Sequence, residues 1–240
     1  MSRALIFSAL RNVVLALLLL AGSAWTLTQV FPLPARVIAQ SLAAFSGLLL
    51  ALSPCLSWHQ PFTHFGAANT VTLLRAGVAA LFAGLLGSTA LLLPDLAWLL
   101  AALATVALIL DGLDGWLARR SGMQSPFGAR FDMEVDAFFT LVLAALVWQS
   151  DKAGVWVCLS GALRYGFVAL GWQWSWLSRP LPPRRRRQTV CVIQIAVLVL
   201  CLTPPLTPPF STFLAAGALG LLALSFAMDI AWLRRQRMQP

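Results

Sequence analysis

Long apolar runs alternate with short polar or proline-rich breaks along nearly the whole chain. Most runs exceed the roughly 20 residues that a helix needs to cross a bilayer. Proline pairs such as Pro204-Pro205 mark firm breaks, because proline lacks a backbone donor and clashes with the preceding turn. The pattern predicts eight helices, over residues 5–30, 36–57, 70–93, 95–119, 132–149, 153–176, 188–203 and 210–233.

The composition indicates that these helices span a membrane. Of the 240 residues, 60% are hydrophobic and only 10% are charged, and the mean hydropathy is +0.82. Soluble domains carry about 25% charged residues. We therefore expect an all-α polytopic membrane protein, a helical bundle of about eight transmembrane helices with no room for a separate soluble domain.

Arginine supplies nearly all of the positive charge. The formal net charge of +9 comes from sixteen arginines and Lys152, set against eight acidic residues. A basic soluble protein would suggest nucleic acid as a partner. Here the arginines fall at helix ends, where they orient the protein and contact anionic lipids, so no nucleic-acid partner is expected. The arginine-rich breaks, including residues 119–130 and 184–187, fall on the same side of the predicted helices, and the breaks on the other side are not rich in arginine. This predicts a bacterial inner-membrane protein with the arginine-rich breaks and both chain ends facing the cytoplasm.

Five of the eight acidic residues fall within 26 positions of an otherwise apolar stretch: Asp111, Asp114, Asp132, Glu134 and Asp136. The first two aspartates are three residues apart and the last two are four apart, so each pair shares one face of its helix. A short loop joins the two helices, and we expect the four aspartates to point into a common volume. Glu134 falls on a different face. Ionised carboxylates at membrane depth are costly and usually functional.

Four carboxylates in one volume repel one another unless cations neutralise them. Oxygen ligands suit Mg²⁺, Mn²⁺ or Ca²⁺, and two such ions can clamp a phosphoryl group during in-line displacement. On the same helix face, Gly115 and Ala118 leave room for a ligand close to the backbone. Arg119 follows as a cation suited to phosphate. These residues predict a metal-dependent site for phosphate chemistry on the cytoplasmic side.

The spacing D-x2-D-G-x2-A-R-x8-G-x3-D-x3-D, from Asp111 to Asp136, resembles the signature of the CDP-alcohol phosphatidyltransferase family at all eight defined positions. Upstream, Asn69, Thr72 and Arg75 resemble the family's N-x2-T-x2-R, although Ala68 stands where the family usually has proline. The resemblance covers roughly residues 66–233 and is of the phosphatidylglycerophosphate or phosphatidylinositol-phosphate synthase type. It implies a six-helix transmembrane core over residues 66–240, preceded by two accessory transmembrane helices within residues 1–65.

The resemblance also implies a role for each motif position. Asp136 would be the general base that takes the proton of the acceptor hydroxyl, and Gly128 would permit close packing where the chain re-enters the membrane. The metal ligands would be Asp111, Asp114, Asp132 and Asp136. The CDP pocket would be lined by Asn69, Thr72, Gly115, Ala118 and Arg119.

Arg164 lies inside the predicted crossing 153–176, where a buried arginine needs an anion. One interpretation is that it faces the aspartates and binds an acceptor phosphate or the lipid diphosphate. The other is a salt bridge, or a side chain that reaches toward the cytoplasmic interface. Arg75 and Arg164 are the candidates for the acceptor or phosphate site.

Taken together, the motifs favour an enzyme of phospholipid synthesis. We expect transfer of a phosphatidyl group from CDP-diacylglycerol to a small alcohol or lipid acceptor, with release of CMP and with two Mg²⁺ or Mn²⁺ ions. The signature serves CDP-aminoalcohol:diacylglycerol phosphotransferases equally, and water as acceptor would give a CDP-diacylglycerol hydrolase. Outside the enzymes, an ion-coupled membrane transporter is the alternative, since transmembrane carboxylates can relay ions. The acceptor stays open, Arg164 tilts the choice toward glycerol 3-phosphate, and the resemblance allows a homodimer.

Overall fold

The computed structural model describes residues 2–179, 181 and 185–237, and this part of the chain is all-α, with no strand. The predicted fold class is therefore confirmed. The α-helices are α1 (Arg3–Val30), α2 (Arg36–Leu52), α3 (Ala67–Gly84), α4 (Pro94–Ser121), α5 (Pro126–Gln149), α6 (Leu159–Gln173), α7 (Arg185–Leu202) and α8 (Phe210–Arg237). Short 3-10 helices lie between them: η1 (Ser53–His59), η2 (Thr89–Leu92), η3 (Val155–Cys158) and η4 (Ser175–Ser178). Arg184, the first residue of the basic run, lies outside the described residues.

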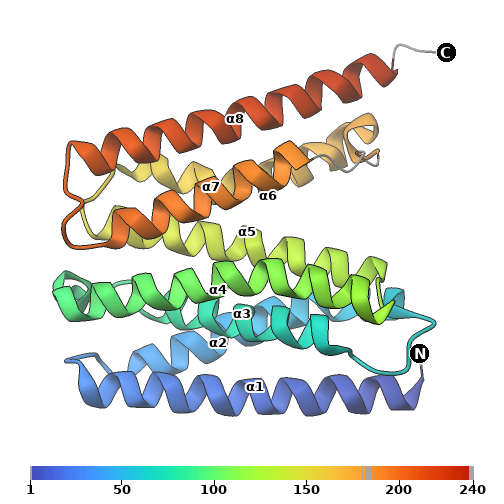
Figure 1. The fold of residues 1–240 in the computed structure, drawn as a ribbon, viewed down its shortest axis with the longest axis horizontal. Helices are drawn as coiled ribbons and strands as arrows, with labels where there is room; N and C mark the ends of the chain where they lie inside the picture. The colour runs from blue at the N-terminus through green and yellow to red at the C-terminus, as the bar shows by residue number, and fades with distance from the viewer. Residues whose placement is uncertain (1, 180, 182–184, 238–240) are drawn as a thin grey trace.

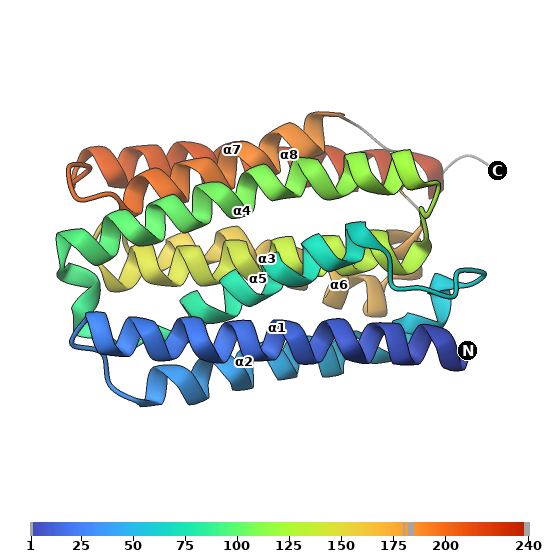
Figure 2. The ribbon, with the colours of Figure 1, turned by 60° about the horizontal axis from the view of Figure 1, so that its bottom comes forward.

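The helices run back and forth along a common axis (Figure 1). Figure 2 shows three layers, with α1 and α2 on one side, α3, α5 and α6 in the middle, and α4, α7 and α8 on the other side. Helix α3 packs against α1, α2, α4 and α5, and α7 packs against α4, α5 and α8. The middle layer therefore meets both outer layers, and side chains of α3, α4 and α5 can converge.

Six of the described helices are long and apolar enough to cross a membrane by length and composition alone. The six spans are Arg3–Val30, Arg36–His59, Ala67–Gly84, Pro94–Ser121, Val155–Gln173 and Phe210–Gln236. The other two helices carry the charges that set them apart: α5 holds three acidic residues, and α7 begins with three arginines. Both lie among the apolar helices, and the chain is therefore an integral membrane protein.

Several helix boundaries differ from the predicted ones, and two of the differences have a clear local cause. The predicted helix 70–93 ends at Gly84, and Gly87, with φ 80°, turns the chain before η2. The predicted helix 132–149 begins six residues earlier, at Pro126, because the Ser125 hydroxyl accepts a hydrogen bond from Gly128 N at 3.1 Å and proline suits the first helical position. Asp132 and Asp136 therefore lie inside α5, where the helix fixes their directions.

One end of the bundle holds the start of α1, the α4–α5 connection and the end of α8 (Figures 1 and 2). Helix α4 stops there at Gly122, whose φ of 66° is the left-handed conformation that glycine adopts without strain. The short connection to Pro126 returns the chain antiparallel to α4. This turn brings the last part of α4 and the first part of α5 side by side.

Candidate active site

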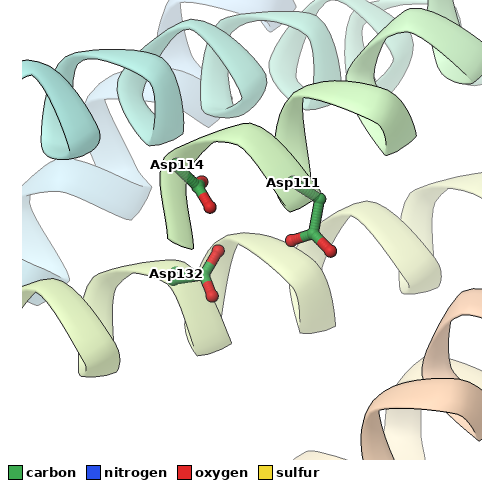
Figure 3. Close-up of side chains that lie close together, drawn as sticks. All are labelled: Asp111, Asp114 and Asp132. Atoms are coloured by element: carbon green, nitrogen blue, oxygen red, sulfur yellow. The ribbon is translucent and has the colours of Figure 1, made fainter. Parts of the chain in front are cut away.

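The aspartates that are spaced along α4 and α5 form a cluster between these two helices. Asp111 and Asp114 point from α4 toward α5, and Asp132 points back from α5 (Figure 3). One carboxylate oxygen from each of these three residues lies within 4.8 Å of the others. Asp114 is buried, whereas Asp111 and Asp132 are half-buried. Three of the four aspartates therefore lie close together, as expected.

Arg75 of α3 contacts all four aspartates. Its Nη1 lies 2.8 Å from Asp114 Oδ2 and 2.6 Å from Asp132 Oδ1. Its Nη2 lies 2.6 Å from Asp111 Oδ1 and also binds Asp136 Oδ1. The arginine side chain is only 3% exposed. One guanidinium thus ties together carboxylates from two helices, and Asp136 joins the cluster through it.

The donor set fits hard divalent cations. Arg75 supplies one positive charge to the cluster, so three negative charges remain when all four carboxylates are ionised. Close carboxylates in a low-dielectric setting repel strongly. Their ligand atoms are all oxygens and lie within a few ångströms of one another, which is the chemistry that Mg²⁺ and Mn²⁺ prefer. Asp111, Asp114 and Asp132 could therefore hold a metal ion.

Two further α3 residues lie against the cluster on the same helix face as Arg75. Thr72 Oγ1 is 3.0 Å from Asp114 Oδ2, to which it can donate, and 3.1 Å from Ala68 O. Asn69 donates from Nδ2 to Phe65 O at 2.6 Å. Both side chains are buried. The i, i+3, i+6 spacing of the upstream motif therefore places three polar residues toward α4 and α5.

Gly128 explains how closely α5 approaches α3. A Cβ atom at this position would lie 3.0 Å from Asn69 Oδ1. Any side chain would press on the buried amide, so the glycine allows the start of α5 to rest against the start of α3. The close packing expected at Gly128 is therefore present, with Asn69 as the neighbour.

Comparison with known proteins agrees with this arrangement. Residues 65–229 match the CDP-alcohol phosphatidyltransferase family. The chain belongs to this family. The matched range contains the whole aspartate cluster and the α3 motif, and α1 and α2 precede it.

A curated relative of this chain comes from Rubrobacter xylanophilus and is named "Bifunctional IPC transferase and DIPP synthase". The two chains are 34% identical over 157 residues, which cover 63% of this chain and 34% of the relative. The chain thus spans about a third of the length of the curated relative that it matches. No solved structure gives a significant match.

The remaining positions of the phosphatidyltransferase motif lie on the last turns of α4. Gly115 and Ala118 are half-buried, and Arg119 is exposed. The Arg119 guanidinium folds back over Gly115, since a Cβ on the glycine would lie 3.3 Å from Arg119 Nη1. Because Gly115 has no side chain, the Arg119 side chain can lie over it, one residue along α4 from Asp114.

Arg164 of α6 forms a salt bridge with Glu134 of α5, at 2.8 Å from Nη2 to Oε1. Arg130 binds the same Glu134 oxygen at 3.0 Å. Of the two interpretations of Arg164, the salt bridge is therefore present. The Nε atom of Arg164 is buried without a hydrogen-bond partner, so the group keeps a donor to offer an anion.

Sequence reasoning missed one residue that shapes the site. His59, fully buried, accepts at Nδ1 from the Ser125 hydroxyl at 2.7 Å and donates from Nε2 to His64 O at 2.9 Å, which holds the N-cap of α5 in place. No local signal links His59 to the motif, because this contact depends on how distant segments pack.

Proposed function

We propose that the protein transfers a phosphatidyl group from CDP-diacylglycerol to the hydroxyl of an alcohol acceptor and releases CMP. The observation that carries this proposal is the convergence of four motif aspartates from α4 and α5 on one volume beside the polar face of α3. Membership of the CDP-alcohol phosphatidyltransferase family supports it. The apolar helices around the site suit a donor with two acyl chains.

Each polar group has a role in this reaction. The acceptor oxygen attacks the phosphorus that carries the diacylglycerol, the bond from that phosphorus to the bridging oxygen breaks, and CMP leaves with the electron pair. Asp136 takes the hydroxyl proton. Asp111, Asp114, Asp132 and Asp136 would hold two Mg²⁺ or Mn²⁺ ions. When bound, such ions neutralise the diphosphate and stabilise the leaving phosphate.

The nucleotide would bind where α3 and the end of α4 meet. Small residues at Gly115 and Ala118 leave room near the α4 backbone, and Arg119 supplies a mobile cation for phosphate. Asn69 and Thr72 would line the same pocket from α3. Positioning the donor in this way lowers the barrier, because the reacting groups no longer need to find one another in solution.

The site would face the cytoplasm of a bacterial inner membrane. The end of the bundle that carries the α4–α5 connection also carries Arg3, Arg119 and Arg120, whereas the opposite end carries Arg36 and Lys152. An excess of arginine marks the cytoplasmic side of membrane proteins. This orientation would bring the soluble CMP product into the cytoplasm, and a homodimer is compatible with the exposed apolar helix faces.

Purified protein is expected to release CMP from CDP-diacylglycerol only when a divalent cation and an acceptor are present. Excess EDTA should abolish the reaction, and added Mg²⁺ or Mn²⁺ should restore it, because three uncompensated carboxylate charges require cations. The measurement is chromatography of the nucleotide and of the lipid product. An acceptor panel of glycerol 3-phosphate, inositol phosphate, serine and a second lipid identifies the alcohol.

Three outcomes of the same assay separate the alternatives. Release of CMP with water alone would indicate a CDP-diacylglycerol hydrolase. Turnover of CDP-choline or CDP-ethanolamine with diacylglycerol would reverse the donor assignment. Intact nucleotide under every condition, with ion flux in proteoliposomes, would favour the transporter.

Replacing Arg164 by alanine is expected to raise the KM for a phosphorylated acceptor by about tenfold, the value of one charge-assisted hydrogen bond. The unpartnered Nε is the donor that the acceptor phosphate would use. The KM for an unphosphorylated acceptor should stay unchanged. Arg130→Ala is the matched control, because Arg130 shares Glu134 but is 40% exposed. An unaltered KM in the Arg164 variant would rule out the anion-binding role.

A further inference from the structure

We propose that Arg75 is the internal counter-cation of the aspartate cluster, and that divalent cations must displace its guanidinium to bind. Arg75 would thereby set the affinity of the site for metal. The inference rests on the proposed metal site, and it assigns Arg75 a positioning role in place of the acceptor contact that the sequence suggested.

The contacts of Arg75 differ from an ordinary salt bridge. Both terminal nitrogens are shared, with Nη1 between Asp114 and Asp132 and Nη2 between Asp111 and Asp136. The guanidinium therefore lies at the centre of the four carboxylates and touches one oxygen of each. Its Nε is buried without a hydrogen-bond partner, so all of its polar contacts to the aspartates are made by the two terminal nitrogens.

This position makes the arginine and a metal ion competitors. A Mg²⁺ or Mn²⁺ ion binds carboxylate oxygens at about 2.0–2.2 Å, closer than the guanidinium nitrogens approach them. An ion between the carboxylates would meet the positive charge of the buried Arg75 within a few ångströms. Metal binding therefore requires the guanidinium to move away from the oxygens that it holds.

The same contacts explain why a cation from the protein is useful at this position. Without metal and without Arg75, four carboxylates would face one another with no compensating charge, and buried uncompensated charges destabilise a fold. In the metal-free protein, Arg75 supplies the compensating charge and anchors α3 to both α4 and α5. Each carboxylate keeps its second oxygen, so the cluster is already assembled when a metal ion arrives.

A role for Arg75 in aligning the carboxylates, in place of competing with metal, predicts a change in metal affinity in the opposite direction when Arg75 is removed. If Arg75 only aligned the carboxylates for metal, its removal would disorder them and weaken metal binding. If it competes with metal, its removal takes away one positive charge and strengthens metal binding. The direction of the change in affinity thus separates competition from alignment.

The test is Mn²⁺ binding to the purified full-length chain, followed by electron paramagnetic resonance, for wild type, Arg75→Met and Arg75→Lys. Methionine matches the length of the arginine stem without its charge. We expect Arg75→Met to bind Mn²⁺ at least about tenfold more tightly than wild type, since a charge a few ångströms away changes affinity by more than that. Lysine keeps the charge but cannot bridge four carboxylates, so its affinity should fall in between.

Thermal unfolding provides the second measurement. In EDTA, Arg75→Met should unfold at a lower temperature than wild type, and Mn²⁺ should raise its midpoint by more than it raises that of wild type. Arg120→Met is the control for charge, because Arg120 lies over Trp116 at the same end of α4 and contacts none of the four aspartates. The Arg120→Met substitution should change neither the affinity for Mn²⁺ nor the midpoint of thermal unfolding.

Equal or weaker Mn²⁺ binding by Arg75→Met overturns the inference and leaves the proposed reaction standing. Failure of wild type to bind Mn²⁺ overturns the proposed metal site and this inference together. If Arg75→Met folds only in the presence of Mn²⁺, Arg75→Lys carries the test, with tighter binding than wild type as the expected result and equal or weaker binding as the contrary one.

Discussion

Replacing Asp136 by asparagine is expected to lower the rate of CMP release by about 10³-fold, within the range for loss of a general base. Asparagine has nearly the same size but cannot accept the hydroxyl proton or carry charge. The fold should survive, because Arg75 still binds Asp111, Asp114 and Asp132. Binding of CDP-diacylglycerol should persist for the same reason. The measurements are CMP release and equilibrium binding of labelled donor.

Asp95→Asn provides the matched control for this substitution. Asp95 lies in the first turn of α4, at the opposite end of the helix from Asp111 and Asp114, and it is exposed. The same change of chemistry there should leave turnover unchanged. Normal CMP release by Asp136→Asn would eliminate Asp136 as the base, and loss of donor binding would show that its chief role is to hold metal.

Replacing Gly161 by alanine is expected to destabilise the protein by about 1–3 kcal/mol, the usual cost of overpacking. A Cβ at Gly161 would lie 2.6 Å from Leu141 N and closer still to the Cα of that residue. Small residues allow transmembrane helices to approach in this way. Helix α6 would have to move away from α5, which would also shift Arg164 from Glu134. A lower midpoint of thermal unfolding in detergent is the measurement.

Gly166→Ala isolates the packing effect, because Gly166 lies in the same helix with nothing within 4 Å of the added Cβ. Alanine favours a helix over glycine by about 0.5–1 kcal/mol, so this variant should be as stable as wild type or slightly more stable. Equal midpoints for the two alanine variants would contradict the close approach of α5 and α6.

The pattern of apolar runs predicted the all-α membrane fold class correctly. The ends of the helices were harder to predict from the sequence. The start of α5 depends on the Ser125 cap, which the buried His59 holds from η1 across 66 positions of sequence. A periodicity argument starts the helix at the first strong apolar repeat and therefore placed its beginning six residues late. Helices α5 and α7 were predicted from their apolar stretches 132–149 and 188–203, although both helices also carry several charged residues.

The aspartates were predictable as a group because their spacing is local. Three or four residues on a helix determine a shared face, and a short loop determines that two such faces meet. Helical spacing did not predict that Arg75 is the residue that binds these aspartates. Arg75 was considered as a phosphate ligand, and nothing in its spacing indicates that its guanidinium reaches all four carboxylates.

The sequence by itself determined that the chain is a membrane-embedded helical bundle, and that two adjacent helices present pairs of aspartates with phosphatidyltransferase spacing. These properties depend on hydrophobicity and on helical repeat, which act over a few residues. The tertiary structure decided which cation lies between the aspartates, which glutamate Arg164 meets, and which histidine holds α5. Those contacts join residues 30 to 66 positions apart. They depend on the packing of whole helices, which no local pattern encodes.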